Sequence, residues 1–297
     1  MIEVKDIVKT FEGFRALDGL SMNIPTGAVY GMLGPNGAGK STAIRHLTGI
    51  LRQDSGEILY DGAPIFENPQ VKSRIAYIPD DVFYFPQSNI NDMMRYYKSV
   101  LPKFDTDRFN KLGQLFDLDP KQPIRKMSKG MQKQASFWLT MSMRPEVLIL
   151  DEPVDGLDPV MRRQVWSIVM SDVAEYGTTV AVSSHNLREL EDVCDHVGII
   201  NRGKIILERA LCDLQENIVK VQIAMPDGQE LPQGLNIVHR SSTGRLQMLI
   251  IRGQAVELTN ILSAANPLFM DLIPLTLEEI FIYELGGADY AVKDLII

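Results

Sequence analysis

The sequence predicts an α/β fold with a helical insertion, followed by a smaller α+β domain. Short apolar runs typical of buried strands alternate with helical stretches through most of residues 1–209. Between about Asn89 and Arg144 the apolar spacing becomes that of helices, which indicates an insertion between strands of the sheet. After residues 209–217 the pattern changes to the strands and helices of a second unit, residues 210–297.

Length and composition are those of a soluble globular protein with one large domain or two ordinary ones. The chain has 297 residues, of which 45% are hydrophobic and 23% are charged. A net charge of −8 argues against a protein that binds nucleic acid through a broad basic surface, although a local basic patch stays compatible with it. We therefore expect no nucleic-acid partner.

Several features point to the cytoplasm. The spacing of the two cysteines, Cys194 and Cys212, fits no metal or redox motif, which suggests inert thiols in a reducing compartment. The N-terminal residues begin directly with strand-like alternation rather than with the pattern of a signal peptide. Apolar runs stay well below the ~18–20 residues of a membrane-spanning helix. Any role at a membrane would then depend on a partner.

The first elements lead to a phosphate-binding loop. Residues 2–24 alternate as two strands around a turn at Glu12-Gly13, and residues 28–33 resemble a buried strand. After the loop, residues 43–50 have helical spacing. The loop matches G-x-x-x-x-G-K-[ST] and consists of Gly34, Pro35, Asn36, Gly37, Ala38, Gly39, Lys40, Ser41 and Thr42.

This loop predicts nucleotide binding. Its glycines let backbone N–H groups surround phosphate oxygens, and the N-terminal end of the next helix adds a positive field. Lys40 can reach the β- and γ-phosphates, and the Ser41 hydroxyl can ligate Mg²⁺. Phe11, at the turn before the loop, is either a base-stacking residue or a core or turn aromatic, and the spacing alone favours the second alternative.

The same patterns predict the remaining elements. Helices should begin at Asn91-Asp92 and at Thr106-Asp107, and Ser128 should cap a third helix that runs to about Met143. Another long helix should begin at Asp158-Pro159. Further strands are predicted at residues 57–60, 74–78, 146–150, 178–182, 197–200, 204–207, 218–225, 236–239, 245–251 and 269–273, with helices at 187–194, 255–265 and 277–285.

Polar residues follow two of these strands directly. Asp151 and Glu152 come after strand 146–150, and His185 comes shortly after strand 178–182. Ligands in an open α/β sheet bind at the carboxyl ends of strands. Asp151 can hold Mg²⁺ through water, Glu152 can act as a general base on the attacking water, and His185 can contact the γ-phosphate or that water. The other histidines are interpreted as structural.

A second anion site is possible at the helix that Ser128 caps. Ser128 offers a hydroxyl and Gly130 offers a backbone N–H at the positive end of the helix dipole. From physical chemistry alone, an ordinary helix N-cap is the commoner explanation.

Five motifs together resemble the nucleotide-binding subunits of ATP-binding cassette (ABC) transporters. GPNGAGKST resembles the Walker A motif, MSKGMQ the signature motif, and LILDEP the Walker B motif with its glutamate. GLDP resembles the D-loop, and SSHNLRELED resembles the segment that carries the switch histidine. They occur in the family's order and cover residues 1–209, which identifies this part as a nucleotide-binding domain.

The resemblance implies a P-loop ATPase core with an antiparallel β subdomain and a helical subdomain at about residues 88–144. It implies Mg-ATP, base stacking by Phe11, and a head-to-tail homodimer or heterodimer that binds two ATP molecules. Ser128 and Gly130 would contact the γ-phosphate of the ATP held by the other subunit, and Asp158 would act across the interface. Hydrolysis would power transport through a separate multi-spanning protein, with this chain on the cytoplasmic face of the membrane.

Two departures from the family's pattern are informative. Asp80 stands where the family usually has Gln, and an ionised Asp can ligate Mg²⁺ but cannot donate a hydrogen bond. The signature carries Lys129 and Met131, a form similar to that of two-subunit bacterial exporters, as is the C-terminal LTLEEIFIYELGG. The aromatic residues 83–85 either pack within their loop or dock the membrane partner.

Two rival functions are compatible with the motifs. A non-transport ABC ATPase of translation or DNA repair usually has tandem cassettes or a long coiled coil, and this chain has neither. A regulatory subunit that binds ATP and hydrolyses it weakly would fit Asp80, but it fits poorly with Lys40, Glu152 and His185.

Overall fold

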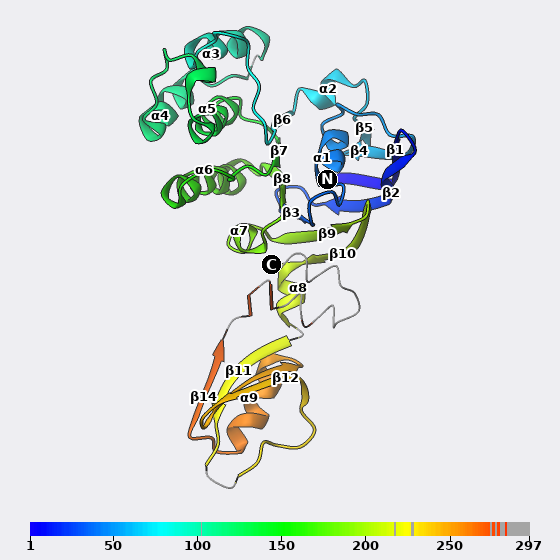
Figure 1. Cartoon of the computed structure of the whole chain (residues 1–297), viewed down its shortest axis with the longest axis vertical. Helices are drawn as coiled ribbons and strands as arrows, with labels where there is room; N and C mark the ends of the chain where they lie inside the picture. The colour runs from blue at the N-terminus through cyan, green and yellow to red at the C-terminus, as the bar shows by residue number, and fades with distance from the viewer. Residues whose placement is uncertain are drawn as a thin grey trace. The chain divides into compact units, whose positions relative to one another are not determined.

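The computed structural model describes residues 1–101, 103–216, 218–226, 229–273, 275–276, 278–279 and 283 (Figure 1). The chain divides into two compact units, each described by itself below. The first comprises Met1–His185 and His196–Glu208, and the second comprises Asn186–Asp195 and Arg209–Ile297. Residues 186–195, which the sequence placed in the first domain, therefore group with the second unit.

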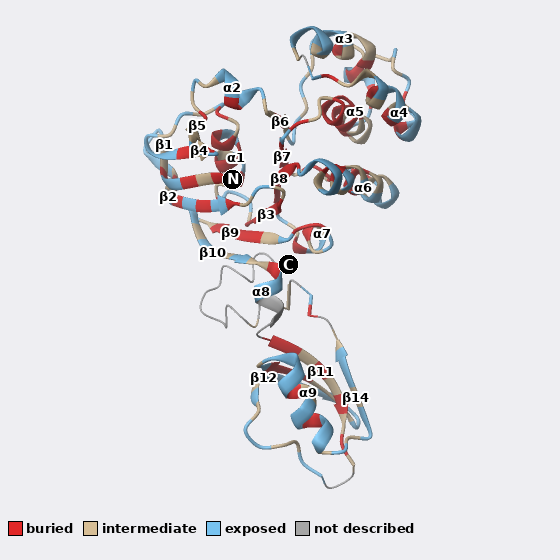
Figure 2. Cartoon of the chain, turned by 180° about the vertical axis from the view of Figure 1, so that it is seen from behind, coloured by how far each residue is buried: buried red, intermediate tan, exposed pale blue. Residues whose placement is uncertain are grey.

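A six-stranded sheet forms the centre of the first unit, in the order β10-β9-β3-β8-β7-β6. From β9 to β6 neighbouring strands run parallel, so their carboxyl ends lie at one edge. Every residue of β3, β7 and β8 is buried, as expected for parallel strands covered on both faces (Figure 2). The strands are β3 (Val29–Leu33), β6 (Ile75–Ile78), β7 (Val147–Asp151), β8 (Thr179–Ser184), β9 (His196–Asn201) and β10 (Lys204–Ala210).

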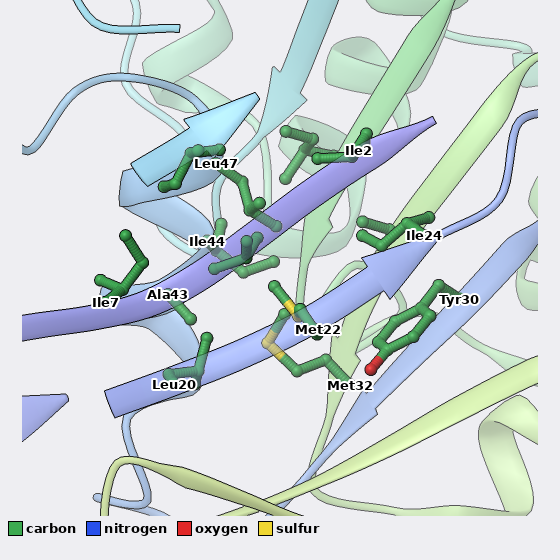
Figure 3. Packing of buried hydrophobic residues seen from close by; sticks show 14 of the residues in the cluster. Ile2, Ile7, Leu20, Met22, Ile24, Tyr30, Met32, Ala43, Ile44 and Leu47 are labelled. Atoms are coloured by element: carbon green, nitrogen blue, oxygen red, sulfur yellow. The ribbon is translucent and has the colours of Figure 1, made fainter. Parts of the chain in front are cut away.

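A second, antiparallel sheet in the order β2-β1-β4-β5 packs with helix α1 (Lys40–Leu47) around the main apolar cluster. Figure 3 shows Ile2, Met22 and Ile44 among the buried side chains of this cluster. The helix begins at Lys40, three residues before the predicted start, because the loop's last residues already have helical geometry. The strands are β1 (Ile2–Phe11), β2 (Phe14–Ile24), β4 (Ser55–Tyr60) and β5 (Ala63–Pro64), and the short helix α2 is Pro69–Lys72.

In the helical insertion the first helix begins at Ile90, one residue before the predicted Asn91-Asp92, the second begins at Thr106 as predicted, and Ser128 caps the third as predicted. The Asn89 side chain and Asp92 form a capping box, and Asp105 and Ser128 cap the next two helices. Helix α5 contacts α3, α4, α6 and strand β6, so it joins the insertion to the sheet. The helices are α3 (Ile90–Val100), α4 (Thr106–Phe116), η1 (Ile124–Lys126), α5 (Lys129–Met141) and, beyond β7, α6 (Pro159–Tyr176).

The second unit contains an antiparallel sheet in the order β12-β13-β11-β14. One side of this sheet packs with helix α9 (Ala255–Ala264) through an apolar cluster that includes Val221, Leu249 and Leu262. The strands are β11 (Ile218–Ala224), β12 (Asn236–Thr243), β13 (Leu246–Arg252) and β14 (Phe269–Ile273), and the short helices are α7 (Leu187–Leu190) and α8 (Leu211–Glu216).

Three differences from the sequence prediction concern the second unit. Helix α7 ends at Leu190, four residues before the predicted end, and α8 was not predicted at all. Strand β12 extends to Thr243, although most of its side chains are exposed, because pairing with β13 rather than burial defines it. The predicted helix 277–285 falls for the most part outside the described residues. Among the helices that the structure describes, none has the length and apolar character required to cross a bilayer.

Candidate functional site

The glycine-rich loop connects β3 to α1, and its glycines are required for different reasons. Gly37 and Gly39 have left-handed backbone conformations, with φ of 82° and 110°. A Cβ atom at Gly39 would lie 2.8 Å from the carbonyl oxygen of Ala16, and one at Gly34 would lie 2.4 Å from that of Ile200. At Gly37, among the described residues other than its two chain neighbours, no atom lies within 4 Å of this position, so the loop's tip has open space there. The loop is therefore packed at its ends and accessible at its tip.

Lys40, the first residue of α1, turns its amine back into the loop. Its Nζ donates to the carbonyl oxygen of Gly34 at 2.6 Å and lies 3.4 Å from that of Pro35. The same atom is 3.4 Å from Oε1 of Glu152. A buried ammonium needs such partners, and a nucleotide's phosphates would replace these oxygens with more strongly charged ones.

Ser41 and Asp151 come together from α1 and the end of β7. The Ser41 hydroxyl donates to Oδ1 of Asp151 at 3.2 Å, and the Ser183 hydroxyl donates to the same oxygen at 2.6 Å. Hydroxyl and carboxylate oxygens are ligands that Mg²⁺ prefers. These residues therefore fit a Mg²⁺ ion bound beside the loop. Ser183 was not singled out from the sequence, although its place two residues before His185 would have pointed to it.

Glu152 and His185 meet across the ends of β7 and β8. Nδ1 of His185 lies 2.9 Å from Oε2 of Glu152. Glu152 has a left-handed backbone, with φ of 45°, which is rare for a residue with a side chain. Together with Asp155, these side chains bring potential ligand atoms within 4.8 Å of one another.

Tyr77 on β6 illustrates the electrostatics of this edge of the sheet. Burial raises the pKa of Tyr77 to about 12, and the negative charge of Asp151 contributes in the same direction. The phenol is therefore neutral throughout the physiological range and adds no negative charge to the site.

Phe11 lies at the hairpin between β1 and β2, opposite Phe14. Its side chain is 41% exposed, and Nζ of Lys9 lies 5.5 Å from the ring centroid. A core position is thus ruled out for Phe11, and the ring has an accessible surface on which a base can stack. Base stacking stays a prediction.

The residues expected to act on the partner's ATP have local roles within one chain. Ser128 caps α5 by accepting a hydrogen bond from the Met131 N–H at 3.3 Å, and Asp158 caps α6. A Cβ atom at Gly130 would lie 3.0 Å from the carbonyl oxygen of Gly156. Ser128 and Asp158 are exposed, so both remain accessible to a second subunit.

Asp80, one of the predicted Mg²⁺ ligands, forms an ion pair within the chain. Its Oδ1 is 3.1 Å from Nζ of Lys133, a residue of α5 that the sequence reasoning missed. One signal in the sequence could have identified Lys133: it is a charged residue on the apolar side of the helix predicted after Ser128. Ligation of Mg²⁺ by Asp80 stays a prediction, and in this arrangement it would fall to Oδ2, since Oδ1 is paired with Lys133.

Comparison with known proteins gives consistent results. A sequence model of a family described as "ABC transporter" matches residues 17–155. The chain is 31% identical to the ABC transporter ATP-binding protein YtrB of Bacillus subtilis (strain 168), over 97% of this chain and 99% of that protein.

Two further comparisons agree with this match. The lantibiotic transport ATP-binding protein SrtF of Streptococcus pyogenes is 34% identical, over 73% of this chain and 94% of that protein. A solved structure of an ATP-binding subunit of an ABC transporter superimposes with a TM-score of 0.67 at 25% identity, covering 72% of this chain and 92% of that one.

Proposed function

The chain belongs to the ABC transporter family as an ATP-binding subunit with ATPase activity, and on this premise we propose that it powers export through a separate membrane protein. One observation carries the proposal most directly. Lys40, Asp151 and Glu152 meet His185 at the carboxyl edge of the parallel sheet, beside the accessible loop. This arrangement supports the ATP-hydrolysis step of the proposal.

Each of these residues has a distinct part in the proposed reaction. Lys40 leaves the loop carbonyls and binds the β- and γ-phosphates of ATP. Ser41 and Asp151 would hold Mg²⁺, which would offset the charge on the phosphoryl oxygens. Glu152 accepts a proton from the attacking water, and His185 orients the Glu152 carboxylate through the hydrogen bond between them.

The reaction is proposed to need a second nucleotide-binding subunit. Ser128 and Gly130 of one chain would contact the γ-phosphate of ATP held on the loop of the other, and Asp158 would act across the same interface. The exposure of Ser128 and Asp158 supports this arrangement. A homodimer and a heterodimer are both compatible with it. The ATP-binding domain is proposed to be residues 1–209, with residues 210–297 as a separate domain.

The membrane partner is proposed to bind at an aromatic surface patch, defined as Phe83, Phe85 and Tyr96. Phe83 is 84% exposed and Phe85 is 55% exposed. The ring of Phe85 packs edge-on against Tyr96 of α3, with centroids 5.4 Å apart. Exposed aromatic rings grouped in this way mark interaction surfaces. Phe83 and Phe85 lie between β6 and α3, a place that would connect the membrane protein to the sheet edge proposed to bind ATP, on the cytoplasmic face.

The experiment compares ATP hydrolysis by the wild type and Glu152→Gln. The variant should lose about 10²- to 10⁴-fold in turnover yet bind ATP, and ATP should shift it to a dimer on gel filtration. Glu257→Gln, an exposed residue of α9, is the matched control and should behave as the wild type. Hydrolysis that is unchanged in Glu152→Gln would refute the assigned mechanism.

A second experiment tests transport against the soluble alternatives. The tagged chain should co-purify from detergent-solubilised membranes with a multi-spanning protein, and the double variant Phe83→Ala, Phe85→Ala should recover much less of it. A chain that never enriches with membranes would favour a regulatory or other non-transport ATPase.

A further inference from the structure

Lys133 makes two contacts that connect the helical insertion to the catalytic edge. Its Nζ donates to the main-chain carbonyl oxygen of Glu152 at 2.6 Å and to Oδ1 of Asp80 at 3.1 Å. The Lys133 side chain is only 6% exposed, whereas that of Asp80 is 55% exposed. Because solvent screens an exposed carboxylate, the shorter bond to the Glu152 carbonyl is the stronger structural constraint of the two.

The Glu152 peptide groups are held on both sides. Lys133 binds the carbonyl oxygen, and the N–H of Glu152 donates to the Ser183 hydroxyl at 3.1 Å. Glu152 adopts a left-handed backbone conformation, which persists only where the surroundings impose it. The two contacts therefore supply the constraint that this conformation needs, and the conformation directs the Glu152 side chain toward His185 and Lys40.

The same helix touches the segment after Glu152 a second time. Gly130, one turn before Lys133, packs so closely on Gly156 that a Cβ atom would lie 3.0 Å from the Gly156 carbonyl oxygen. The first turns of α5 thus contact both ends of residues 152–156. A movement of α5 would be transmitted to Glu152 directly, without passing through the loop that binds the nucleotide.

We propose that Lys133 is a positioning residue for ATP hydrolysis, which holds the Glu152 main chain from α5 and, through Asp80, links it to the end of β6. This inference rests on the proposed role of Glu152. Because Lys133 holds the main chain of the proposed base and is not part of the phosphate-binding loop, we expect it to affect the rate of the chemical step rather than ATP binding. An ammonium group suits this position because it can donate to a carbonyl and a carboxylate at the same time.

The first test is Lys133→Met, which keeps the apolar stem and removes the amine. Turnover should fall about 10- to 100-fold because the base is displaced, while the Kd for ATP and the thermal midpoint change little. Lys111→Met, which alters an exposed lysine of α4, is the matched control and should hydrolyse ATP as the wild type does. A Lys133→Met variant with wild-type turnover would overturn the proposal.

The double variant Asp80→Asn, Lys133→Met separates positioning from charge balance. It leaves no unpaired charge, so it stays informative should Lys133→Met alone fail to fold. If Lys133 positions Glu152 through its carbonyl, the double variant should hydrolyse ATP more slowly than the wild type. Wild-type turnover in the double variant would mean that Lys133 only neutralises Asp80, and the proposal would be wrong.

A third comparison places Lys133→Met in the Glu152→Gln background, measured by single-turnover hydrolysis of radiolabelled ATP. A residue that acts through Glu152 should slow this background by less than about threefold, because interacting sites are non-additive. Equal slowing in both backgrounds would contradict the proposal. If Glu152→Gln itself were fully active, the proposed function would fail. If only Lys133→Met were fully active, the function would stand without this inference.

Discussion

Glu152 and His185 are direct hydrogen-bond partners, with Oε2 of the carboxylate 2.9 Å from Nδ1 of the imidazole. The bond joins the ends of two adjacent parallel strands, β7 and β8. With Glu152 ionised, the Nδ1–H group of His185 donates. Nε2 of the neutral ring can then accept a hydrogen bond from an incoming water, whereas a phosphate oxygen, itself an acceptor, would need Nε2 to carry a proton as well. The proposed base and the proposed switch histidine therefore form one hydrogen-bonded unit.

His185→Ala should reduce turnover about 10²-fold or more, because the Glu152 carboxylate loses the partner that orients it. The Kd for ATP should stay within about threefold, since the loop and Lys40 are untouched. Steady-state hydrolysis and equilibrium nucleotide binding measure the two effects separately. His239→Ala, which alters an exposed histidine of β12, is the control and should retain full activity. A large loss of ATP affinity in His185→Ala would contradict the role given to His185.

Asp151→Asn should raise the Mg²⁺ concentration needed for half-maximal hydrolysis by about 10- to 100-fold. The amide oxygen can still accept the hydrogen bonds from Ser41 and Ser183, so the loss reports the missing charge rather than a collapsed site. A magnesium titration of the ATPase rate measures the shift. Asp117→Asn is a suitable control, because Asp117 is exposed and its left-handed backbone, with φ of 47°, also accommodates Asn. An unchanged magnesium requirement in Asp151→Asn would exclude Asp151 as the metal-binding carboxylate.

Phe11→Ala should weaken ATP binding about 5- to 150-fold, as expected for the loss of one stacked base. Phe14→Ala is the matched control, since Phe14 faces Phe11 across the hairpin and is 67% exposed. Phe14→Ala should bind ATP as the wild type does, and Phe11→Trp should retain the affinity. Titration with a fluorescent ATP analogue distinguishes the variants. Equal losses in both alanine variants would indicate a damaged hairpin rather than a lost stacking contact.

His46 should make the fold less stable in mild acid. Burial lowers the pKa of His46, against the hydrogen bond to the Thr42 carbonyl, which favours protonation. Because the folded-state pKa is below the usual value near 6.5, the unfolded chain binds the proton more readily. At pH values above about 6.5, His46 is neutral in both states and takes nothing from the free energy of unfolding. As the pH falls below about 6.5 toward the lower folded-state pKa, the unfolded chain takes up the proton first, and the free energy of unfolding decreases. Thermal unfolding between pH 7.5 and 5.5 should show a smaller decrease in Tm for His46→Leu than for the wild type. An equal decrease in both proteins would disprove this contribution.

Much of the fold, and the residues proposed for the site, could be predicted from short stretches of sequence. The capping residues Asn89, Asp105, Ser128 and Asp158 determine where four helices begin, because side-chain caps act over a few residues. The apolar runs before Gly34, Asp151 and His185 predicted buried parallel strands, whose carboxyl ends share one edge by topology. Helix α8 and the far half of β12 escaped prediction, because neither has a clear apolar period.

The sequence by itself determined the family, and it predicted the phosphate-binding loop and the acidic and histidine residues at the strand ends, since each motif is recognised from residues close together in the chain. Only the tertiary structure decided how these residues are held. The pairing of Glu152 with His185, and of Lys133 with both Asp80 and Glu152, joins residues on different elements. In the sequence, Asp80 is only a departure from the family's usual Gln. In the structure it forms an ion pair with Lys133, over fifty positions away, because a buried lysine needs an acceptor.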